Sequence, residues 1–335
     1  MFRLRHIVRR PTVEDERRFE QWNVRSNRER YLAANPLERY ASDVAYREKV
    51  DRIRAGLNGL TGVILDLGGN TAGEATILVQ QGFRVVVGDI NEVALDISRT
   101  RALRFGLQMP DYVALDVHEL PFKSEAFSAV TVVEALHHFR NYRQALHEIH
   151  RVLKPGGTLL AFEPNARNPI RRLSELRDRL RGSIEKSFSR RQLLALCSTA
   201  GFDGVAIDSM PSRRSGWNID RVPAYRRPLA RLHASLGEAF PAWFGIWKVQ
   251  ARKSGRPSSE DDSRVDVRQL LRSPGDRHEL RFDAEQGVWI EEHGSLMFPD
   301  LNGIPVLIGS NASRVGQTTR SRRAEAIAAN RSSSA

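Results

Sequence analysis

The chain has 335 residues, with 52 Lys and Arg against 40 Asp and Glu and a single cysteine. That length suits one full α/β domain with a smaller addition. A lone cysteine, Cys197, excludes an internal disulfide and favours a reducing, cytoplasmic location. No apolar run is long enough to cross a bilayer, and the Arg-rich first residues lack the apolar core of a secretion signal.

The positive charge is concentrated in one part of the chain. Residues 163–255 carry 18 Lys and Arg against 8 Asp and Glu, whereas residues 63–162 carry 9 against 11. A dense positive cluster attracts anionic partners. We therefore expect residues 163–255 to contact a partner that carries acidic groups, phosphates or an anionic surface.

Residues 1–62 are predicted to form an N-terminal helical segment of two or three helices. Apolar and aromatic residues recur there at roughly helical spacing: Phe19, Trp22, Tyr40, Val44, Val50 and Ile53. Tyr31, Tyr40 and Tyr46 are candidates for a pocket wall, but ordinary helix packing is the interpretation we favour for each of them.

A strand, a glycine-rich turn, a helix and a second strand are predicted between Val63 and Asp89. The apolar run of residues 63–67 leads into Gly68-Gly69-Asn70-Thr71-Ala72-Gly73, and a second apolar run ends at Asp89. This is a βαβ unit of a nucleotide-binding sheet. Glycines let the backbone turn sharply and lie against a ligand. Asp89 stands where a carboxylate can accept both hydroxyls of a ribose.

A dehydrogenase turn, G-x-G-x-x-G followed by an acidic residue, is the competing interpretation. Asp66, the carboxylate before the first glycine, separates the two. With it the stretch resembles the first motif, (D/E)-x-G-x-G-x-G, of the class I S-adenosylmethionine-dependent methyltransferases, although Asn70 and Ala72 replace two glycines. Asn tolerates left-handed backbone angles. The resemblance implies S-adenosylmethionine as cofactor and a set of residues that bind it: Asp66, Gly68, Gly69, Asn70, Gly73, Asp89 and Ile90. It also implies a helical lid formed by residues 1–62.

The next strands carry further matches to that family. A third strand, residues 112–115, ends at Asp116, and the resemblance assigns Asp116 and Val117 to the adenine. A fourth strand, residues 127–133, leads into Glu134, which is a candidate for cofactor binding or equally for capping a helix, and then into His137 and His138. In the ubiquinone-biosynthesis-like branch a histidine after this strand commonly faces the cofactor or substrate. His138 or His137 is therefore the candidate general base, and a structural hydrogen bond is the alternative for both.

The remaining strands complete the predicted sheet. A helix from Tyr142 to Leu153 closes with Lys-Pro-Gly-Gly, and the phrase Glu148 to Gly157 is typical of the ubiquinone-biosynthesis-like branch. A fifth strand (158–162), a helix (188–201), a parallel sixth strand (205–207) and an antiparallel seventh (243–252) follow. We predict an α/β, Rossmann-like, seven-stranded, mostly parallel sheet with helices on both faces, spanning residues 63–253. Ile170, Leu173, Leu176 and Leu180 share one face of a basic amphipathic helix.

The C-terminal part is predicted to be separate and β-rich. A linker at residues 254–265 precedes a small domain at 266–311 with strands at 279–282, 287–290 and 305–308, and residues 312–335 are expected to be a disordered tail. Phe298-Pro299 and Asn302 to Leu307 make the domain similar to the zinc-ribbon-type domain of methyltransferase activator subunits. Ser273, Asp276, Ile290 and His293 stand near the cysteine positions of zinc-bearing members, so we expect no structural zinc.

Three functions remain open. The first is methyl transfer to a small-molecule acceptor, acidic or lipid-like, with the basic segments near the pocket or on a membrane surface. The second is an RNA methyltransferase, which the arginine clusters would suit; no Asn-Pro-Pro-Tyr-like tetrapeptide follows the fourth strand, which argues against it. The third is a non-catalytic scaffold, suggested by Asn70 and Ala72. The sequence gives no indication of the oligomeric state.

Overall fold

The computed structural model describes residues 13–179, 186–211, 227–256 and 265–314. Its centre is a sheet with the strand order β6-β7-β5-β4-β1-β2-β3, which continues past β3 into β11. The strands of its central part are β1 (Val63–Leu67), β2 (Arg84–Asp89), β3 (Asp111–Leu115), β4 (Phe127–Val133), β5 (Leu153–Pro164), β6 (Asp203–Met210) and β7 (Ile246–Arg252). Neighbouring strands from β3 to β5 are parallel, and β7 is antiparallel to both β5 and β6. The predicted sheet is therefore confirmed.

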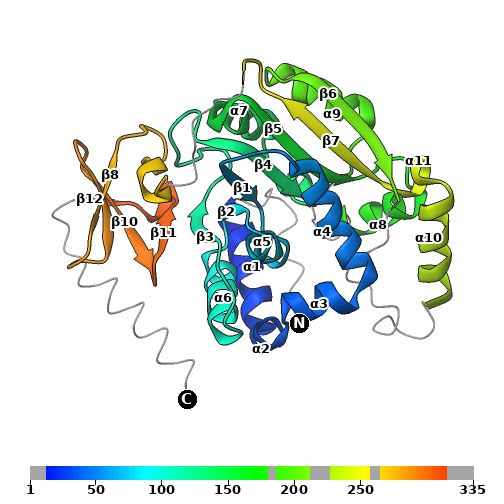
Figure 1. Ribbon diagram of the computed structural model, residues 1–335, viewed down its shortest axis with the longest axis horizontal. Helices are drawn as coiled ribbons and strands as arrows, with labels where there is room; N and C mark the ends of the chain where they lie inside the picture. The colour runs from blue at the N-terminus through cyan, green and yellow to red at the C-terminus, as the bar shows by residue number, and fades with distance from the viewer. Residues whose placement is uncertain (1–12, 180–185, 212–226, 257–264, 315–335) are drawn as a thin grey trace.

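Helices cover both faces of this sheet (Figure 1). One face packs against α7 (Tyr142–Val152) and α9 (Arg190–Thr199), and the other against α4 (Val44–Leu57), α5 (Gly73–Gln80) and α6 (Glu92–Arg104). Side chains alternate along a strand, so Leu65 joins the core beneath α7 and α9, while Ile64 joins the core beneath α4 and α5. Burial on both faces explains why β1 reads as a continuous apolar run.

Several boundaries differ from the sequence prediction. β5 begins at Leu153, because Lys154 to Gly157 are extended rather than a separate turn. The seventh strand starts at Ile246, after the short helix α11 (Pro241–Phe244), so Trp243 is helical. On α8 (Pro169–Arg179) two leucines of the predicted apolar face are exposed, Leu173 by 70% and Leu176 by 56%. Leu180 lies outside the described residues.

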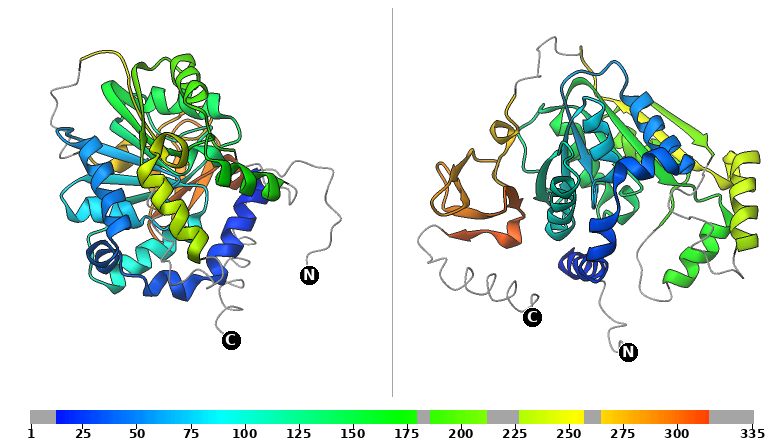
Figure 2. Two further views of the ribbon diagram at one scale, coloured as in Figure 1. Left: turned by 90° about the vertical axis from the view of Figure 1, so that its right-hand side faces the viewer. Right: turned by 60° about the horizontal axis from the view of Figure 1, so that its bottom comes forward.

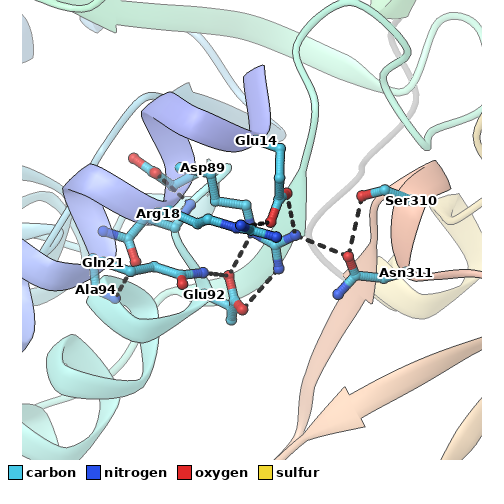
Figure 3. A network of polar contacts seen from close by, with 10 residues as sticks. Glu14, Arg18, Gln21, Asp89, Glu92, Ala94, Ser310 and Asn311 are labelled. Carbon is cyan, nitrogen blue, oxygen red and sulfur yellow. Dashed lines mark hydrogen bonds and ion pairs between the residues drawn. The ribbon is translucent and has the colours of Figure 1, made fainter. Parts of the chain in front are cut away.

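Within its described part, residues 13–62, the N-terminal segment forms four helices rather than two or three: α1 (Val13–Ser26), α2 (Arg28–Ala33), α3 (Pro36–Ser42) and α4. Both α1 and α2 pack against α6. Arg17 of α1 is 5% exposed and joins three parts of the chain: it donates to Glu14 of its own helix, to Glu92 of α6 and to Asn311 near the C-terminus. Figure 3 shows the surroundings of this network, with Glu92 and Asn311 reaching it from opposite sides.

The C-terminal strands lie beside β3, at the end of the sheet opposite α10 (Arg227–Ala239) (Figures 1 and 2). They are β8 (Leu280–Asp283), β9 (Val288–Glu291), β10 (Leu296–Leu301), β11 (Ile304–Leu307) and β12 (Ser313–Arg314). β11 pairs in parallel with β3, where Val306 faces Ala114 and Leu307 faces Leu115. An exposed edge strand favours unwanted pairing, and β11 covers this edge of the sheet.

The zinc-ribbon likeness stays a prediction. Ser273, at a position where a zinc-bearing relative has cysteine, is fully buried; its hydroxyl accepts a hydrogen bond from the amide of His278 at 3.0 Å, and its own amide donates to the carbonyl of His278 at 2.9 Å. These two hydrogen bonds close the turn between Ser273 and His278. Of the expected tail, Ala312 is described, Ser313 and Arg314 pair with β10, and residues 315–335 lie outside the described residues.

Candidate functional site

A cavity of about 380 Å³ opens at the carboxyl ends of β1, β2, β3 and β4. Ligands of open α/β sheets bind at this edge. Most of the residues expected to bind the cofactor line it: Gly68, Gly69, Asn70, Asp89, Ile90, Asp116, Val117 and Glu134. His138 lines it as well. Asp66, Gly73 and His137 do not; they lie behind the wall and support it.

The glycine-rich turn keeps its shape in spite of the two replacements. Asn70 has φ 48° and Ala72 has φ 49°, so both adopt the left-handed conformation that the glycines of the motif allow. Gly68 is also left-handed, and a Cβ there would lie 2.5 Å from the Cβ of Ala135. A Cβ on Gly73 would lie 2.8 Å from the hydroxyl of Tyr46, so this glycine lets α4 pack against α5. The turn therefore keeps its conformation although Asn70 and Ala72 replace two glycines of the motif.

Asp66 holds the turn from below. The hydroxyl of Thr131 donates to Oδ1 of Asp66 at 2.6 Å. A Cβ on Gly69 would lie 2.8 Å from Oδ2 of Asp66, so the turn can rest on this carboxylate only with glycine there. Burial raises the pKa of Asp66 to about 7, against the hydrogen bond from Thr131. Its carboxyl group therefore changes charge near neutral pH.

Asp89 joins the turn to the second strand. Its Oδ2 accepts a hydrogen bond from the amide of Asn70 at 2.8 Å, and its Oδ1 accepts one from the amide of Asn91 at 2.9 Å. Burial raises the pKa of Asp89, and these amides oppose the shift. Each carboxylate oxygen keeps a second lone pair for a ligand.

Asp116 is held by a residue that the sequence reasoning missed. His118 donates to Oδ1 of Asp116 through its backbone amide at 2.9 Å and through Nδ1 at 2.6 Å, while its Nε2 accepts from the amide of Asn141. Burial works against the charge of Asp116, but the hydrogen bonds from His118 hold its pKa below the usual value. The Asp-x-His spacing of residues 116 and 118 is the sequence signal that could have indicated this contact.

The two histidines after β4 have different surroundings. The ring of His137 is buried and donates from Nδ1 to Oε2 of Glu163 at 2.8 Å. Glu163 is fully buried, and its Oε1 also accepts hydrogen bonds from the amides of Ala135 and Leu136. Glu163 therefore fixes the short helix η1 (Leu136–His138), and His137 is part of that support.

His138 is the histidine that faces the cavity. Its ring lies against that of His137, with 4.2 Å between the ring centroids and 36° between their planes. Desolvation of the ring, together with the charges of His137 and Arg171, lowers the pKa of His138 to about 4. The ring is therefore neutral at pH 7, the state that a general base requires, and it is a weaker base than an ordinary histidine.

The N-terminal helices contribute two lining residues, Glu20 and Lys49. Neither follows from a motif, and the candidates Tyr31, Tyr40 and Tyr46 are absent from the lining. Tyr46 is buried beside Gly73, and Tyr40 donates to Asp51 at 2.7 Å. Helical spacing alone does not indicate which polar side chain of a helix reaches a cavity formed by other elements.

The donor set suits a nucleoside joined to an amino acid. Asp89 and Asp116 stand at the ends of adjacent strands, where their carboxylates can accept hydrogen bonds from hydroxyl and amino groups. Lys49 and Glu134 stand further along the same edge. Among the described residues, no cluster of His, Cys, Asp and Glu is arranged to hold a metal ion, and none of their helices is both long and apolar enough to span a bilayer.

A family model described as a methyltransferase domain matches residues 65–161. The ubiquinone/menaquinone biosynthesis C-methyltransferase UbiE of Pseudomonas entomophila is 32% identical over 174 residues, covering 44% of this chain and 68% of that protein. The demethylmenaquinone methyltransferase of Thermus thermophilus is 34% identical over 136 residues, covering 40% of this chain and 60% of that protein. The chain spans only 53% and 41% of the length of two other quinone methyltransferases that it matches.

Among solved structures, phosphoethanolamine N-methyltransferase 2 of Haemonchus contortus matches 62% of this chain and 53% of its own, with a TM-score of 0.49 and 16% identity. That likeness is too weak to indicate an acceptor.

Proposed function

The chain belongs to the class I S-adenosylmethionine-dependent methyltransferases, in the branch that includes UbiE, and on this premise we propose that it methylates a small, lipid-like hydroxylated aromatic acceptor at carbon. The carbon-methylating quinone enzymes among its relatives support the acceptor class. The observation that carries the proposal is the position of His138, a neutral histidine that lines the same cavity as Asp89 and Asp116.

S-adenosylmethionine supplies a methyl group on a cationic sulfur, which is already an activated leaving group. The protein must therefore mainly position the acceptor and exclude water. A phenolic acceptor gains from losing its hydroxyl proton, because the ring carbon beside the oxygen then becomes more nucleophilic. A ring nitrogen of His138 would take that proton, while Glu163 and His137 hold η1 in place.

Part of the cavity wall is apolar. Val117, Val133, Ala135 and Phe139 line it. Apolar lining with a few polar groups is typical of sites for small organic ligands. A lipid-like acceptor fits this wall better than a highly charged one does, although the basic segment between residues 163 and 255 keeps an acidic acceptor as the alternative.

Contact with a membrane surface is a further part of this proposal. Leu173 and Leu176 are exposed on α8, which follows β5 at the same edge of the sheet, and Arg172 is exposed beside them. Exposed leucines with arginines suit the boundary of an anionic bilayer, where a lipid-like acceptor would be found. Other arginines that suggested RNA, including Arg213, Arg214 and Arg221, lie outside the described residues.

Label transfer from methyl-labelled S-adenosylmethionine tests the proposal. Three acceptors are offered separately: a short-chain prenylated hydroquinone, a phosphorylated phenol and bulk tRNA. We expect label on the hydroquinone, in a product whose mass fragments place the methyl group on ring carbon. Label only in tRNA would establish the RNA alternative, and label only in the phosphorylated phenol would establish an acidic acceptor. Bound cofactor with no transfer to any of them would favour the non-catalytic alternative.

A further inference from the structure

A lysine stands between two carboxylates at one end of the cavity. Lys49 comes from α4, and its Nζ lies 2.8 Å from Oε1 of Glu74 and 3.2 Å from Oε2 of Glu134. All three side chains line the cavity. Glu74 is on the first turn of α5, and Glu134 is the residue that ends β4. The lysine thus connects the N-terminal helical segment to the carboxyl edge of the sheet.

Two neighbouring carboxylates stabilise the charged form of Lys49. Burial opposes that charge, but the carboxylates of Glu74 and Glu134 outweigh it and raise the pKa of Lys49 above its usual value. An ammonium group has three N–H donors. Glu74 and Glu134 accept from two of them, and among the described residues Lys49 has no third partner. One donor therefore remains for a ligand in the cavity.

The backbone of Glu134 holds its side chain at this place. Its φ is 53°, a left-handed conformation that is uncommon for residues other than glycine. Its amide donates to the carbonyl of Phe162 at 2.8 Å, so the strained residue is fixed by β5. Such strain is concentrated at functional sites, where the surrounding structure enforces it. Glu134 is therefore held as a second polar group beside Lys49.

The positions of these residues along the sheet indicate which part of the cofactor they meet. The strand order β4-β1-β2-β3 places Glu134, Gly68, Asp89 and Asp116 in that sequence along one edge. The cofactor is a linear molecule with adenine, ribose, sulfur and amino acid in that order. If Asp116 and Asp89 serve the adenosine, as the proposed function requires, the amino-acid end extends toward Gly68, Glu134 and Lys49.

We propose that Lys49 binds the carboxylate of the cofactor's amino-acid end, with Glu134 accepting from its ammonium group. A zwitterion needs one group of each sign, and this end of the cavity provides both. Glu74 is the positioning residue that holds Lys49 in place. The inference rests on the proposed cofactor site and adds the residue that distinguishes the complete cofactor from a bare nucleoside thioether.

Calorimetric titration with two ligands tests the assignment. S-adenosylhomocysteine carries the amino acid, whereas 5′-methylthioadenosine has a methyl group in its place. We expect Lys49→Met to weaken S-adenosylhomocysteine binding about 10- to 100-fold, the usual worth of a hydrogen bond to a charged group. Binding of 5′-methylthioadenosine should change by less than about twofold. Lys49→Arg should restore part of the loss, because the charge is retained.

Controls separate this effect from damage to the fold. Lys123 is an exposed lysine outside the cavity, and Lys123→Met should change neither affinity. Because Lys49→Met leaves Glu74 without its partner, the double variant Lys49→Met/Glu74→Gln removes the charge imbalance and should show the same selective loss. Arg140 also lines the cavity, and Arg140→Met examines the competing assignment.

The possible results decide between distinct conclusions. Equal weakening of both ligands, or none, in the folded Lys49 variants would overturn the assignment while leaving the cofactor site intact. Selective loss in Arg140→Met instead would transfer the role to Arg140. Failure of the wild type to bind either ligand would overturn the proposed function itself, and the inference with it.

Discussion

Arg17 and Glu92 form a two-point ion pair, with 2.7 Å between Nη2 and Oε1 and 3.2 Å between Nε and Oε2. Glu92 begins α6 just after Asp89, so the pair connects helix α1 to the loop that carries the candidate ribose ligand. Gln21 of α1 donates to the same carboxylate at 2.9 Å, and Asn311 accepts from Arg17 on the other side (Figure 3). Helix α1, helix α6 and the segment between β11 and β12 thus meet at one buried guanidinium.

Replacement of Arg17 should therefore lower the stability of the folded protein. Breaking a buried ion pair leaves a desolvated charge without a partner, so Arg17→Met should lower the free energy of unfolding by about 3 kcal/mol. Arg18 is the matched control: it also pairs with Glu14, but its side chain is 74% exposed, so Arg18→Met should cost less than about 0.5 kcal/mol. Urea denaturation measures both, and equal effects would show that the network does not hold α1.

His138 should be needed for transfer but not for cofactor binding. His138→Gln should reduce kcat by about 100-fold, the usual range for a general base, with the affinity for S-adenosylhomocysteine unchanged. Protonation removes the base, so wild-type kcat/KM, which reports the groups of the free enzyme, should fall only as the pH drops through about 4 rather than through the ordinary histidine value of 6.5. Stopped assays from pH 4 to 8 measure this, and an acid limb near 6.5 would contradict the assignment.

Asp66 should make stability depend on pH near neutrality. Its pKa rises from 3.8 to about 7 on folding, so the folded state binds the proton more tightly than the unfolded state does. Stability is then present at low pH and is lost as the pH rises toward and past 7. Between pH 5 and 8 the wild type should lose about 2–3 kcal/mol relative to Asp66→Asn. Parallel curves for the two proteins would refute the shift.

Gly68 should be required by the cofactor site rather than by general folding. Gly68→Ala adds a Cβ 2.5 Å from that of Ala135 and forces a left-handed alanine into the turn, so S-adenosylhomocysteine binding should be lost. Gly82 has φ 91°, but a Cβ added there would meet no atom within 4 Å, which makes Gly82→Ala the control for backbone strain alone. It should reduce stability by about 1 kcal/mol and leave binding intact. Similar binding losses in both variants would show that the turn at Gly68 has no special part in holding the cofactor.

The sequence predicts the central sheet well because its strands are buried on both faces and end in residues with distinct chemistry. Asp89, Asp116 and His138 follow strands at one edge, so topology alone brings them together. The sequence does not predict which side chains of the helices packed over that edge reach the cavity. Lys49 lies on a polar helix face, and only the packing of α4 against α5 brings it to the cavity.

The sequence also does not predict that the C-terminal strands extend the sheet. Their apolar residues indicate strands, but parallel pairing of β11 with β3 depends on contacts nearly 200 residues apart in the chain. Helical spacing places Leu173 and Leu176 on one apolar face, but it does not predict that the structure leaves both side chains exposed. Periodicity identifies an apolar face, and it does not identify what covers that face.

Calorimetric titration of S-adenosylhomocysteine into the wild type and Asp89→Ala tests the central claim most directly. Asp89 lines the cavity, and both of its oxygens hold the turn and loop that surround the expected ribose position. We expect micromolar binding to the wild type and a loss of about 100-fold or more in the variant, with both proteins folded by circular dichroism. Equal affinities would place the ligand elsewhere, and a folded wild type that does not bind would contradict the cofactor site altogether.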